Sequence, residues 1–328
     1  MKIPPDYELT QEMIDLFAQV ETKKALLENI PVSAALINNL QRQSLLKSSL
    51  FSAKIEGNSL DISDLDRLEK LDPSLKEKLE VENIFSAFNF VRENPNRIID
   101  KNFISDLHRI VMKGLTSDLG ELRKKPSAIF NQFGFPVYMP PPPSQISGLL
   151  EQLVDYINSD KKENILIKAA LAHIAFEKIH PFLDGNGRVG RLLYQALLAK
   201  GNYHFNWLLT LEEGINEKKE EYYVYLDKND ATSFIEFSLS ILQACSQKVL
   251  DKFLEKEIIS DDLLLPRRKE ILDIIKDQKV ASLDTIKRRF LKIPSRTLRY
   301  DLKQLEKSGF IVKIGSTRGA MYKVKNKK

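Results

Sequence analysis

Twelve consecutive residues, His180 to Arg191, hold a concentrated set of reactive side chains. They read His-Pro-Phe-Leu-Asp-Gly-Asn-Gly-Arg-Val-Gly-Arg and combine an imidazole, a carboxylate, an amide between two glycines and two guanidinium groups. An imidazole titrates near neutrality and therefore suits general-base chemistry. The carboxylate of Asp184 is a hard oxygen ligand that suits Mg²⁺ together with water and phosphate oxygens. The segment therefore predicts a site that holds a polyphosphate and removes a proton beside it.

The second half of the segment predicts the start of a helix, because apolar residues recur at helical spacing from Val189 onward. Gly185, Asn186 and Gly187 allow positive φ and close backbone approach, so several N–H groups can converge on an anion. Unpaired N–H groups and the positive end of the helix dipole favour phosphate there. The two arginines, three positions apart, can grip successive phosphates. A plain turn with a helix cap is the alternative, but it leaves the histidine and both arginines unexplained.

The segment resembles the Fic family signature, His-x-Phe-x-(Asp/Glu)-Gly-Asn-Gly-Arg-x-x-Arg, at every fixed position. The resemblance implies transfer of AMP from ATP to a Tyr, Thr or Ser hydroxyl of a protein, this chain itself included. ATP and Mg²⁺ are the implied cofactors. The related Doc branch, which transfers phosphate, has Lys where this chain has Gly187, and this difference favours nucleotidyl transfer. The implied roles are general base for His180, metal ligand for Asp184, α-phosphate contact for Asn186 and the N–H groups around it, β-phosphate contact for Arg188 and γ-phosphate contact for Arg191.

A second resemblance lies upstream, at residues 52–57. Ser52, Glu56 and Gly57 fill the fixed positions of the inhibitory helix of Fic proteins, Ser/Thr-x-x-x-Glu-Gly/Asn, which implies inhibition by an N-terminal helix. A carboxylate of Glu56 paired with Arg191 would occupy the guanidinium meant for the γ-phosphate. By itself the string also fits a plain helix end with a glycine stop. In some family members the same glutamate removes AMP, so the reverse reaction stays open.

The composition is that of a globular protein. The chain has 328 residues, of which 43% are hydrophobic and 29% charged, and this length allows two or three domains. The N-terminus has no apolar signal core and no apolar run is long enough to span a bilayer, so we expect a cytoplasmic protein without a membrane partner. The single cysteine, Cys245, excludes an intrachain disulfide, and its apolar helical surroundings predict a buried thiol.

Helical patterns dominate the chain and predict a mainly α-helical fold. We expect an N-terminal helical region with the inhibitory helix over residues 1–95, a Fic core over 96–258 and a winged helix-turn-helix domain over 265–328. His108 and His173 lie within helical patterns and are expected to be structural. In the first two regions helices are expected over 10–57, with a break at Pro31 and Ser33 as an N-cap, and over 60–96, 103–115, 146–158, 165–179, 217–226 and 234–254.

Residues 127–138 interrupt the helical pattern and predict a short β-hairpin, which four prolines follow. In the Fic family the corresponding hairpin is a flap over the active site that docks the target as an added strand, and this would register the hydroxyl against His180. A hairpin without such a role is the alternative. Downstream, Tyr222-Tyr223-x-x-Leu226 resembles a family element near the adenine pocket, which implies a nucleotide contact for Tyr223. Core packing is the alternative for that tyrosine.

The C-terminal part is a basic module. Residues 266–328 contain 19 Lys and Arg against 6 Asp and Glu, a net charge of +13, which leaves −8 for residues 1–265 of a chain with net charge +5. We expect helices over 267–278 and 283–290, a third that Ser295 caps, and a hairpin of 310–314 with 320–324. DNA is the expected partner, and a protein partner is the alternative. The side chains expected to face outward on the third helix are Arg296, Thr297, Arg299, Tyr300 and Lys303.

Three functions fit these patterns. The first is an adenylyltransferase that Glu56 holds in check, the second a DNA-binding regulator whose Fic core senses nucleotide, and the third a Fic enzyme that mainly removes AMP. A pure sensor has no need of His180, so the complete signature favours an enzyme. The sequence leaves the oligomeric state open and allows a homodimer.

Overall fold

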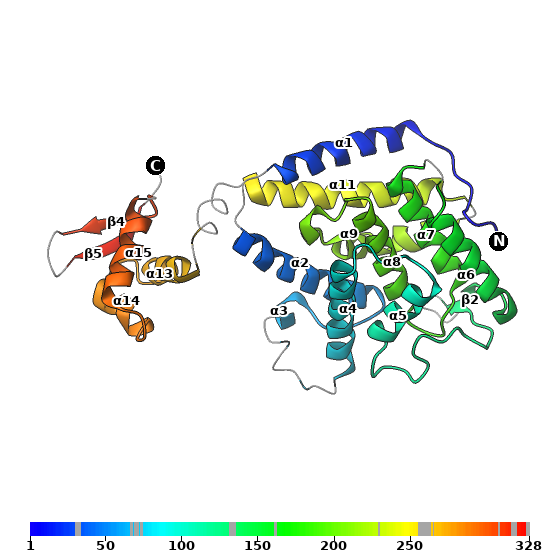
Figure 1. Ribbon diagram of the computed structural model, residues 1–328, viewed down its shortest axis with the longest axis horizontal. Helices are drawn as coiled ribbons and strands as arrows, with labels where there is room; N and C mark the ends of the chain where they lie inside the picture. Colours follow the sequence, from blue (N-terminus) through cyan, green and yellow to red (C-terminus); the bar gives the residue numbers. More distant parts are fainter. Residues whose placement is uncertain are drawn as a thin grey trace. The chain divides into compact units, whose positions relative to one another are not determined.

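The structure is a computed structural model of all 328 residues, and it describes residues 1–29, 34–65, 68, 72, 75–130, 136–160, 163–228, 230–254, 264, 266–307, 309–315 and 320–325. The chain forms two compact units, Met1–Ile30 with Ile37–Leu250 and Pro31–Leu36 with Asp251–Lys328. Helices dominate both units, which confirms the predicted fold class (Figure 1). None of the helices in the described ranges is long and apolar enough to cross a membrane.

The first unit is built almost wholly from helices. It contains most of the two regions expected over 1–95 and 96–258, so the N-terminal helices and the core are parts of one compact unit. Its helices are α1 (Gln11–Glu28), α2 (Ala34–Ile55), α3 (Ile62–Leu65), α4 (Lys76–Glu93), α5 (Lys101–Val111), α6 (Pro143–Ile157), α7 (Ile165–Ile179), α8 (Asn186–Lys200), the 3₁₀ helix η2 (Phe205–Trp207), α9 (Leu211–Glu217), α10 (Lys219–Asp227) and α11 (Thr232–Leu254).

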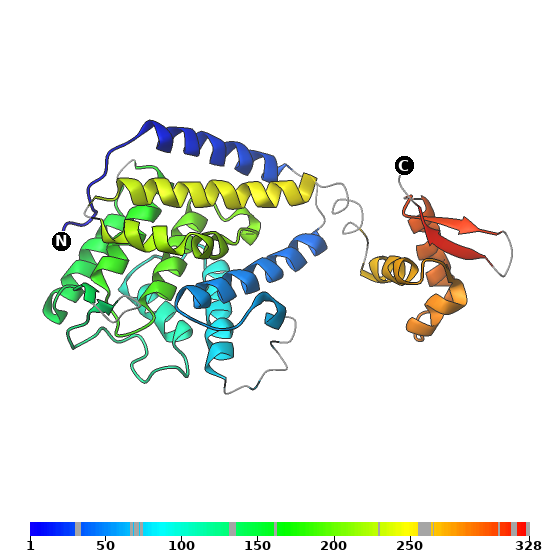
Figure 2. The same ribbon diagram turned by 180° about the vertical axis from the view of Figure 1, so that it is seen from behind.

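Helices α7 and α8 form the centre of this unit. Almost every side chain of the two helices is buried, polar ones included. Helices α4, α5 and α6 pack around them, and α1 lies along α11 in both views (Figures 1 and 2). The hydroxyl of Thr10, which caps α1, donates to Glu236 on α11 at 2.6 Å. The loop between α7 and α8 therefore begins and ends in the most buried part of the unit.

Several helix boundaries differ from the prediction for local reasons. The helix expected over 60–96 is divided into α3 and α4, with Pro73 between them in the sequence. Helix α6 begins at Pro143, because a helix start leaves its first N–H groups unpaired and proline has none to lose. The helix expected over 217–226 begins at Lys219, since α9 ends at Glu217. Ser33, the expected cap of α2, lies outside the described residues.

The predicted hairpin is present as β1 (Ile129–Phe130) and β2 (Pro136–Tyr138). The strands are antiparallel, with Ile129 opposite Tyr138 and an irregular register at the next pair. Residues 131–135, where we expected the turn, lie outside the described residues. The hydroxyl of Tyr138 donates to the carbonyl of Lys178 at 2.9 Å, which fastens β2 to the last turn of α7. The hairpin therefore contacts α7 at Lys178, two residues before His180.

In its described residues, the second unit combines three helices with a small sheet. Its elements are α13 (Pro266–Asp277), β3 (Ala281–Ser282), α14 (Leu283–Arg289), α15 (Ser295–Lys307), β4 (Ile311–Ile314) and β5 (Met321–Val324). The sheet is antiparallel in the order β3-β5-β4. Leucine and isoleucine side chains from all three helices form most of the hydrophobic core of this unit. The sequence pattern missed β3, which is only two residues long. Helix α15 includes Ser295, which we expected as its cap, and residues 316–319 of the expected wing lie outside the described residues.

Two buried side chains of the first unit have the structural roles expected. His173 is 3% exposed, its Nε2 lies 2.8 Å from the hydroxyl of Tyr222, and burial lowers its pKa to about 3. Cys245 is likewise 3% exposed and in contact with the carbonyl of Thr210, and burial raises the pKa of its thiol to about 12. Neither group is therefore charged near pH 7.

The depressed pKa of His173 predicts a pH-dependent stability. A histidine that binds a proton near pH 6.5 when unfolded, but only near pH 3 when folded, gives full stability above about pH 6.5 and loses it as the pH falls toward 3. Between pH 7 and pH 5 this one group should lower the free energy of unfolding by about 2 kcal/mol. Urea unfolding of the chain and of His173→Gln at both pH values measures it. An equal pH dependence in the two proteins would contradict the assignment.

Candidate active site

The loop of residues 180–185 joins the two central helices, and side chains that bind its main chain hold it in place. His180 ends α7 in the left-handed region, with φ 48° and ψ 61°, and Gly185 precedes α8 with φ 81°. The side-chain amide of Asn186, the first residue of α8, accepts from the N–H of Phe182 and donates to its carbonyl, each at 2.9 Å. Asn186 is 2% exposed. Its side chain therefore closes the loop from inside.

His108 on α5 holds the same loop from the other side. Its ring stacks on Phe182 with 3.9 Å between centroids. Nδ1 accepts from the N–H of Gly120 at 2.8 Å, so Nε2 carries the proton and donates to the carbonyl of Asp184 at 3.1 Å. Burial lowers the pKa of His108, which keeps this tautomer neutral. The structural role expected for His108 is the one that the structure gives it.

Arg123 binds the main chain around His180. It is 3% exposed, its Nε donates to the carbonyl of His180 at 2.7 Å, and its Nη2 donates to that of Pro141 at 2.6 Å. Its own N–H donates to the carbonyl of Pro181 at 2.9 Å. In the described part of the chain no carboxylate forms an ion pair with it, and burial lowers its pKa. No pattern in the sequence indicated a buried arginine at this position.

The imidazole of His180 is largely enclosed. Burial lowers its pKa, and the neighbouring carbonyl of Glu177 and the carboxylates of Glu56 and Asp184 oppose that effect only in part. The ring is therefore neutral near pH 7. A neutral imidazole at a fixed position can accept a proton, so the structure leaves His180 able to act as a base.

Arg191 is buried and bound to the end of α2. Its side chain is 2% exposed. Nε donates to the hydroxyl of Ser52 at 3.0 Å, and Nη2 donates to the carbonyl of Ser52 and to Oε1 of Glu56, each at 2.9 Å. Burial works to lower the pKa of Arg191, but Glu56, with smaller contributions from Tyr222, Tyr223 and Glu177, outweighs burial and raises it. The structure thus brings Ser52 and Glu56 into contact with an arginine more than 130 positions later in the sequence.

The end of α2 directs Glu56 toward Arg191. The N–H of Gly57 donates to the carbonyl of Lys54 at 3.0 Å and that of Asn58 to Ala53 at 3.1 Å, which is the Schellman arrangement. Gly57 has φ 99°, a conformation that side chains disfavour. The helix therefore stops directly after Glu56, as the glycine predicted.

The carboxylate of Glu56 occupies the space over Gly187. A Cβ built at that position would overlap Oε1 of Glu56 and would lie 3.1 Å from Nη1 of Arg191. Glycine is thus the residue that lets a carboxylate approach the backbone at the start of α8. The same approach is what an anion at this helix N-terminus needs.

Arg188 points to other partners than Arg191. Its side chain is 4% exposed, Nη2 donates to Oδ1 of Asp184 at 2.9 Å, and Nη1 lies 3.6 Å from Oε1 of Glu80 on α4. The carboxylate of Asp184 also accepts from the N–H of Gly185 at 2.6 Å. Each of the two arginines of the motif is therefore paired with a carboxylate in the structure.

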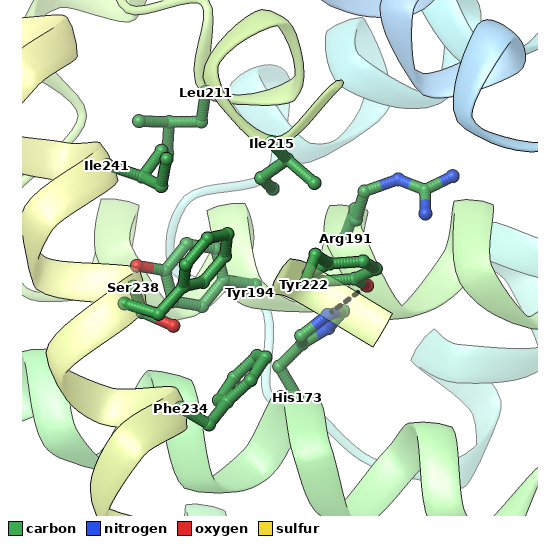
Figure 3. A pocket seen from close by; sticks show the side chains of 10 residues that line it. His173, Arg191, Tyr194, Leu211, Ile215, Tyr222, Phe234, Ser238 and Ile241 are labelled. Carbon is green, nitrogen blue, oxygen red and sulfur yellow. Dashed lines mark hydrogen bonds between the residues drawn. The ribbon is translucent and has the colours of Figure 1, made fainter. Parts of the chain in front are cut away.

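Aromatic side chains line a small cavity next to Arg191. Figure 3 shows its guanidinium pointing away from the hydrogen-bonded pair of Tyr222 and His173. The cavity between these side chains has a volume of about 20 Å³, room for about one water molecule. It is lined by His173, Arg191, Tyr194, Leu211, Ile215, Tyr222, Phe234, Phe237, Ser238 and Ile241.

Tyr223 lies beside the end of α2. Its ring contacts that of Tyr222 edge-on, with 5.3 Å between centroids, and its hydroxyl lies 3.5 Å from the carbonyl of Ile55. The side chain remains partly exposed. Tyr223 thus contacts the residue that precedes Glu56 in the sequence.

Glu177 is a further acidic residue that the sequence analysis did not single out. It lies on α7, and a Cβ at Gly190 would overlap its Oε1. Burial raises its pKa to about 8, and Oε1 has no hydrogen-bond partner in the described structure. The signal in the sequence was a glutamate in the last turn of a mostly apolar helix. The carboxylate of Glu177 fills the space that a side chain at position 190 would need, which explains the glycine there.

Known proteins resemble this chain in sequence and in fold. Residues 98–198 match the family described as Fic/DOC. "Protein adenylyltransferase Fic" of Drosophila willistoni is 25% identical over 250 residues, which are 72% of this chain and 47% of that protein. This chain therefore spans about half the length of the curated relative.

The solved structures extend the likeness in fold. A Fic family protein from Desulfovibrio desulfuricans G20 has a TM-score of 0.76 over 99% of both chains, at 22% identity. Fic-1 from C. elegans has a TM-score of 0.61 over 74% of this chain and 73% of its own, at 20% identity. The first of these shares the fold along nearly the whole chain, the C-terminal unit included.

The contacts of Arg123 predict its contribution to stability. Arg123→Ala leaves the carbonyls of His180 and Pro141 buried without a donor, so the free energy of unfolding should fall by about 2–4 kcal/mol. Urea unfolding measures this. Arg109→Ala, which removes an exposed ion pair with Asp106, is the matched control and should cost less than about 1 kcal/mol. Equal losses in the two variants would show that the carbonyl contacts contribute little.

Proposed function

Because residues 98–198 form a domain of the Fic/DOC family, we propose that this chain transfers AMP from Mg-ATP to a Tyr, Thr or Ser hydroxyl of a protein and that Glu56 holds this activity in check. The observation that carries the proposal is the contact of Glu56 with Arg191 above Gly187. An acidic group there stands where a nucleotide phosphate would bind. The relatives named protein adenylyltransferase Fic support the chemistry.

His180 is the general base of this proposal. Its neutral imidazole accepts the proton of the target hydroxyl, whose oxygen then attacks the α-phosphorus as the bond to pyrophosphate breaks. The left-handed backbone at His180 and the hydrogen bond from Arg123 fix the direction of the ring. Positioning of this kind lowers the entropy cost of reaching the transition state. The hairpin β1–β2, fastened to α7 through Tyr138, is placed to dock the target segment as an added strand.

The phosphates bind at the start of α8. The amide side chain of Asn186 is already bonded to Phe182, so this residue serves the α-phosphate through its backbone N–H and through the loop shape that it maintains. Arg188 takes the β-phosphate and Arg191 the γ-phosphate, and Tyr223 lies on the adenine side. Charge that develops on the phosphates then meets fixed donors, which need no rearrangement.

The residues at the mouth of this loop fit a magnesium ion. The carboxylate of Asp184 is 66% exposed and accepts hydrogen bonds from Arg188 and Gly185, so one of its oxygens remains for a cation. Asp184 would hold Mg²⁺ together with phosphate oxygens and water. The ion would supply positive charge to the phosphates as the bond to pyrophosphate breaks.

Inhibition follows from competition for one guanidinium. Glu56 and the γ-phosphate both require Nη2 of Arg191, and the carboxylate is part of the chain, so its local concentration is high. ATP that binds without this contact is held in an unproductive position. Glu56 is 34% exposed and can therefore also meet water, which keeps removal of AMP by the same carboxylate as the alternative direction.

Intact-mass spectrometry after incubation with Mg-ATP tests the proposal. Glu56→Gly frees Arg191, so this variant should gain one AMP unit per chain. The fraction of modified chains should be at least about tenfold larger than in the unsubstituted protein. The double variant Glu56→Gly with His180→Ala should gain none. Both variants should bind ATP, which a nucleotide-binding assay checks.

If Glu56→Gly binds ATP but modifies neither itself nor any protein in a cell extract, the chemistry is not AMP transfer. If it modifies no better than the unsubstituted protein, Glu56 is not an inhibitor. The two outcomes separate the reaction from its regulation.

A second candidate function, DNA binding, rests on the exposed face of α15. Arg296, Arg299 and Lys303 are exposed on it, and Tyr300 is 56% exposed beside them. Asp301 on the same helix is fully buried, with Arg267 at 2.5 Å and Arg268 at 3.0 Å. Its charge is therefore withdrawn from the surface, which leaves a cationic face suited to phosphates.

Salt dependence tests DNA binding. Replacing Arg296, Arg299 and Lys303 by Ala removes three phosphate contacts, so the slope of log K against log salt for a mixed-sequence duplex should become shallower by about 3. Fluorescence anisotropy measures the slope. Lys113, Lys200 and Lys218, exposed lysines of the first unit that are replaced together by Ala, are the matched control with the same loss of charge, and their slope should stay unchanged. Identical slopes in the two variants would mean that α15 does not contact DNA.

A further inference from the structure

Arg188 is a buried cation whose two acidic partners differ in exposure. Its own side chain is 4% exposed. Asp184 accepts its hydrogen bond but is 66% exposed, whereas Glu80 is 13% exposed and lies 3.6 Å away. Removing a guanidinium from water is costly unless a counter-ion accompanies it. Glu80 is thus the partner that compensates the charge of Arg188 on the buried side.

Glu80 is itself held in place by the segment that follows the inhibitory glutamate. The amide of Asn58 donates to Oε2 of Glu80 at 2.7 Å and to the carbonyl of Glu77 at 2.9 Å. Its oxygen accepts from the N–H of Leu60 at 3.0 Å, and the whole residue is 8% exposed. One oxygen of Glu80 therefore faces Asn58 and the other faces Arg188.

We propose that Glu80 is a positioning residue for Arg188 and that Asn58 ties it to the end of the inhibitory helix. The inference rests on the proposed function, in which Arg188 contacts the β-phosphate. Asp184 faces solvent and is free to turn to a metal ion, whereas Glu80 stays on the buried side and keeps the guanidinium aimed at the phosphate. A guanidinium held in this way needs less ordering when the ligand binds.

The contacts also connect the two arginines. Asn58 comes two residues after Glu56, and its backbone N–H closes α2 at Ala53. The same short segment therefore contacts Arg191 directly through Glu56 and Arg188 indirectly through Glu80. Any movement of the end of α2 acts on both phosphate-binding cations.

The test measures how strongly AMP, ADP and ATP bind to variants made in the Glu56→Gly protein, by isothermal titration calorimetry with Mg²⁺. Glu80→Gln keeps the size and the contact with Asn58 but removes the charge. It should weaken ADP and ATP about tenfold and leave AMP, which has no β-phosphate, within about twofold. Glu93→Gln, which changes an exposed acid on the same helix, is the control and should change none of the three. Adding Glu80→Gln to Arg188→Ala should have no further effect.

Unchanged ADP affinity in Glu80→Gln, tighter ADP binding, or an equal loss for AMP would each overturn the proposal, the last because it indicates general damage to the site. A further loss on top of Arg188→Ala would also overturn it. If Glu56→Gly binds the nucleotides as expected but transfers no AMP, only the proposed function fails. If it binds none of them, both proposals fail.

Discussion

The charge of Arg191 is the constraint on which the arrangement of the first unit depends. A guanidinium at 2% exposure lies in the centre of the unit, on a helix whose other side chains are almost all buried. Such a charge is tolerated only where donors are matched by acceptors. Ser52 and Glu56 supply these acceptors, and they do so from a helix that begins more than 130 residues earlier. The position of α2 therefore determines which groups bind Arg191 in the site.

The loop beside Arg191 shows a different principle, in which polar side chains bind the main chain. The side chains of Asn186, His108 and Arg123 together satisfy four N–H and carbonyl groups, which belong to the loop residues His180, Phe182 and Asp184. Buried main-chain groups without partners would cost about 1–3 kcal/mol each. These side chains therefore hold the backbone in left-handed and turn conformations that the chain would not otherwise keep. The loop backbone in turn sets the positions of the His180 and Asp184 side chains.

The sequence predicted the parts of the molecule whose signals are local. Helical spacing located α7 to the residue, the glycine after Glu56 marked the end of α2, and the interruption of the helical pattern over residues 127–138 located the hairpin. The contact of Glu56 with Arg191 was expected only from the resemblance to Fic proteins. The contacts of Arg123 and Glu80 were not predicted because their partners, His180 and Arg188, lie far away in sequence. A buried arginine that binds carbonyl groups has no pattern of its own, and short elements such as β3 are set by tertiary pairing.

The two contacts of Arg191 differ in a way that bears on how quickly the site can change state. Ser52 is 1% exposed and binds the guanidinium through both its hydroxyl and its carbonyl, whereas Glu56 is attached at the last residue before the helix stop and is one-third exposed. When the carboxylate leaves, the guanidinium keeps its orientation through Ser52. Under the proposed mechanism, activation then involves one side chain that returns to water and the helix end behind it. Fraying of a helix end is among the fastest and least costly motions of a folded protein. The proposed inhibited state would therefore differ from the active one by a single ion pair, while Ser52 holds the guanidinium in both.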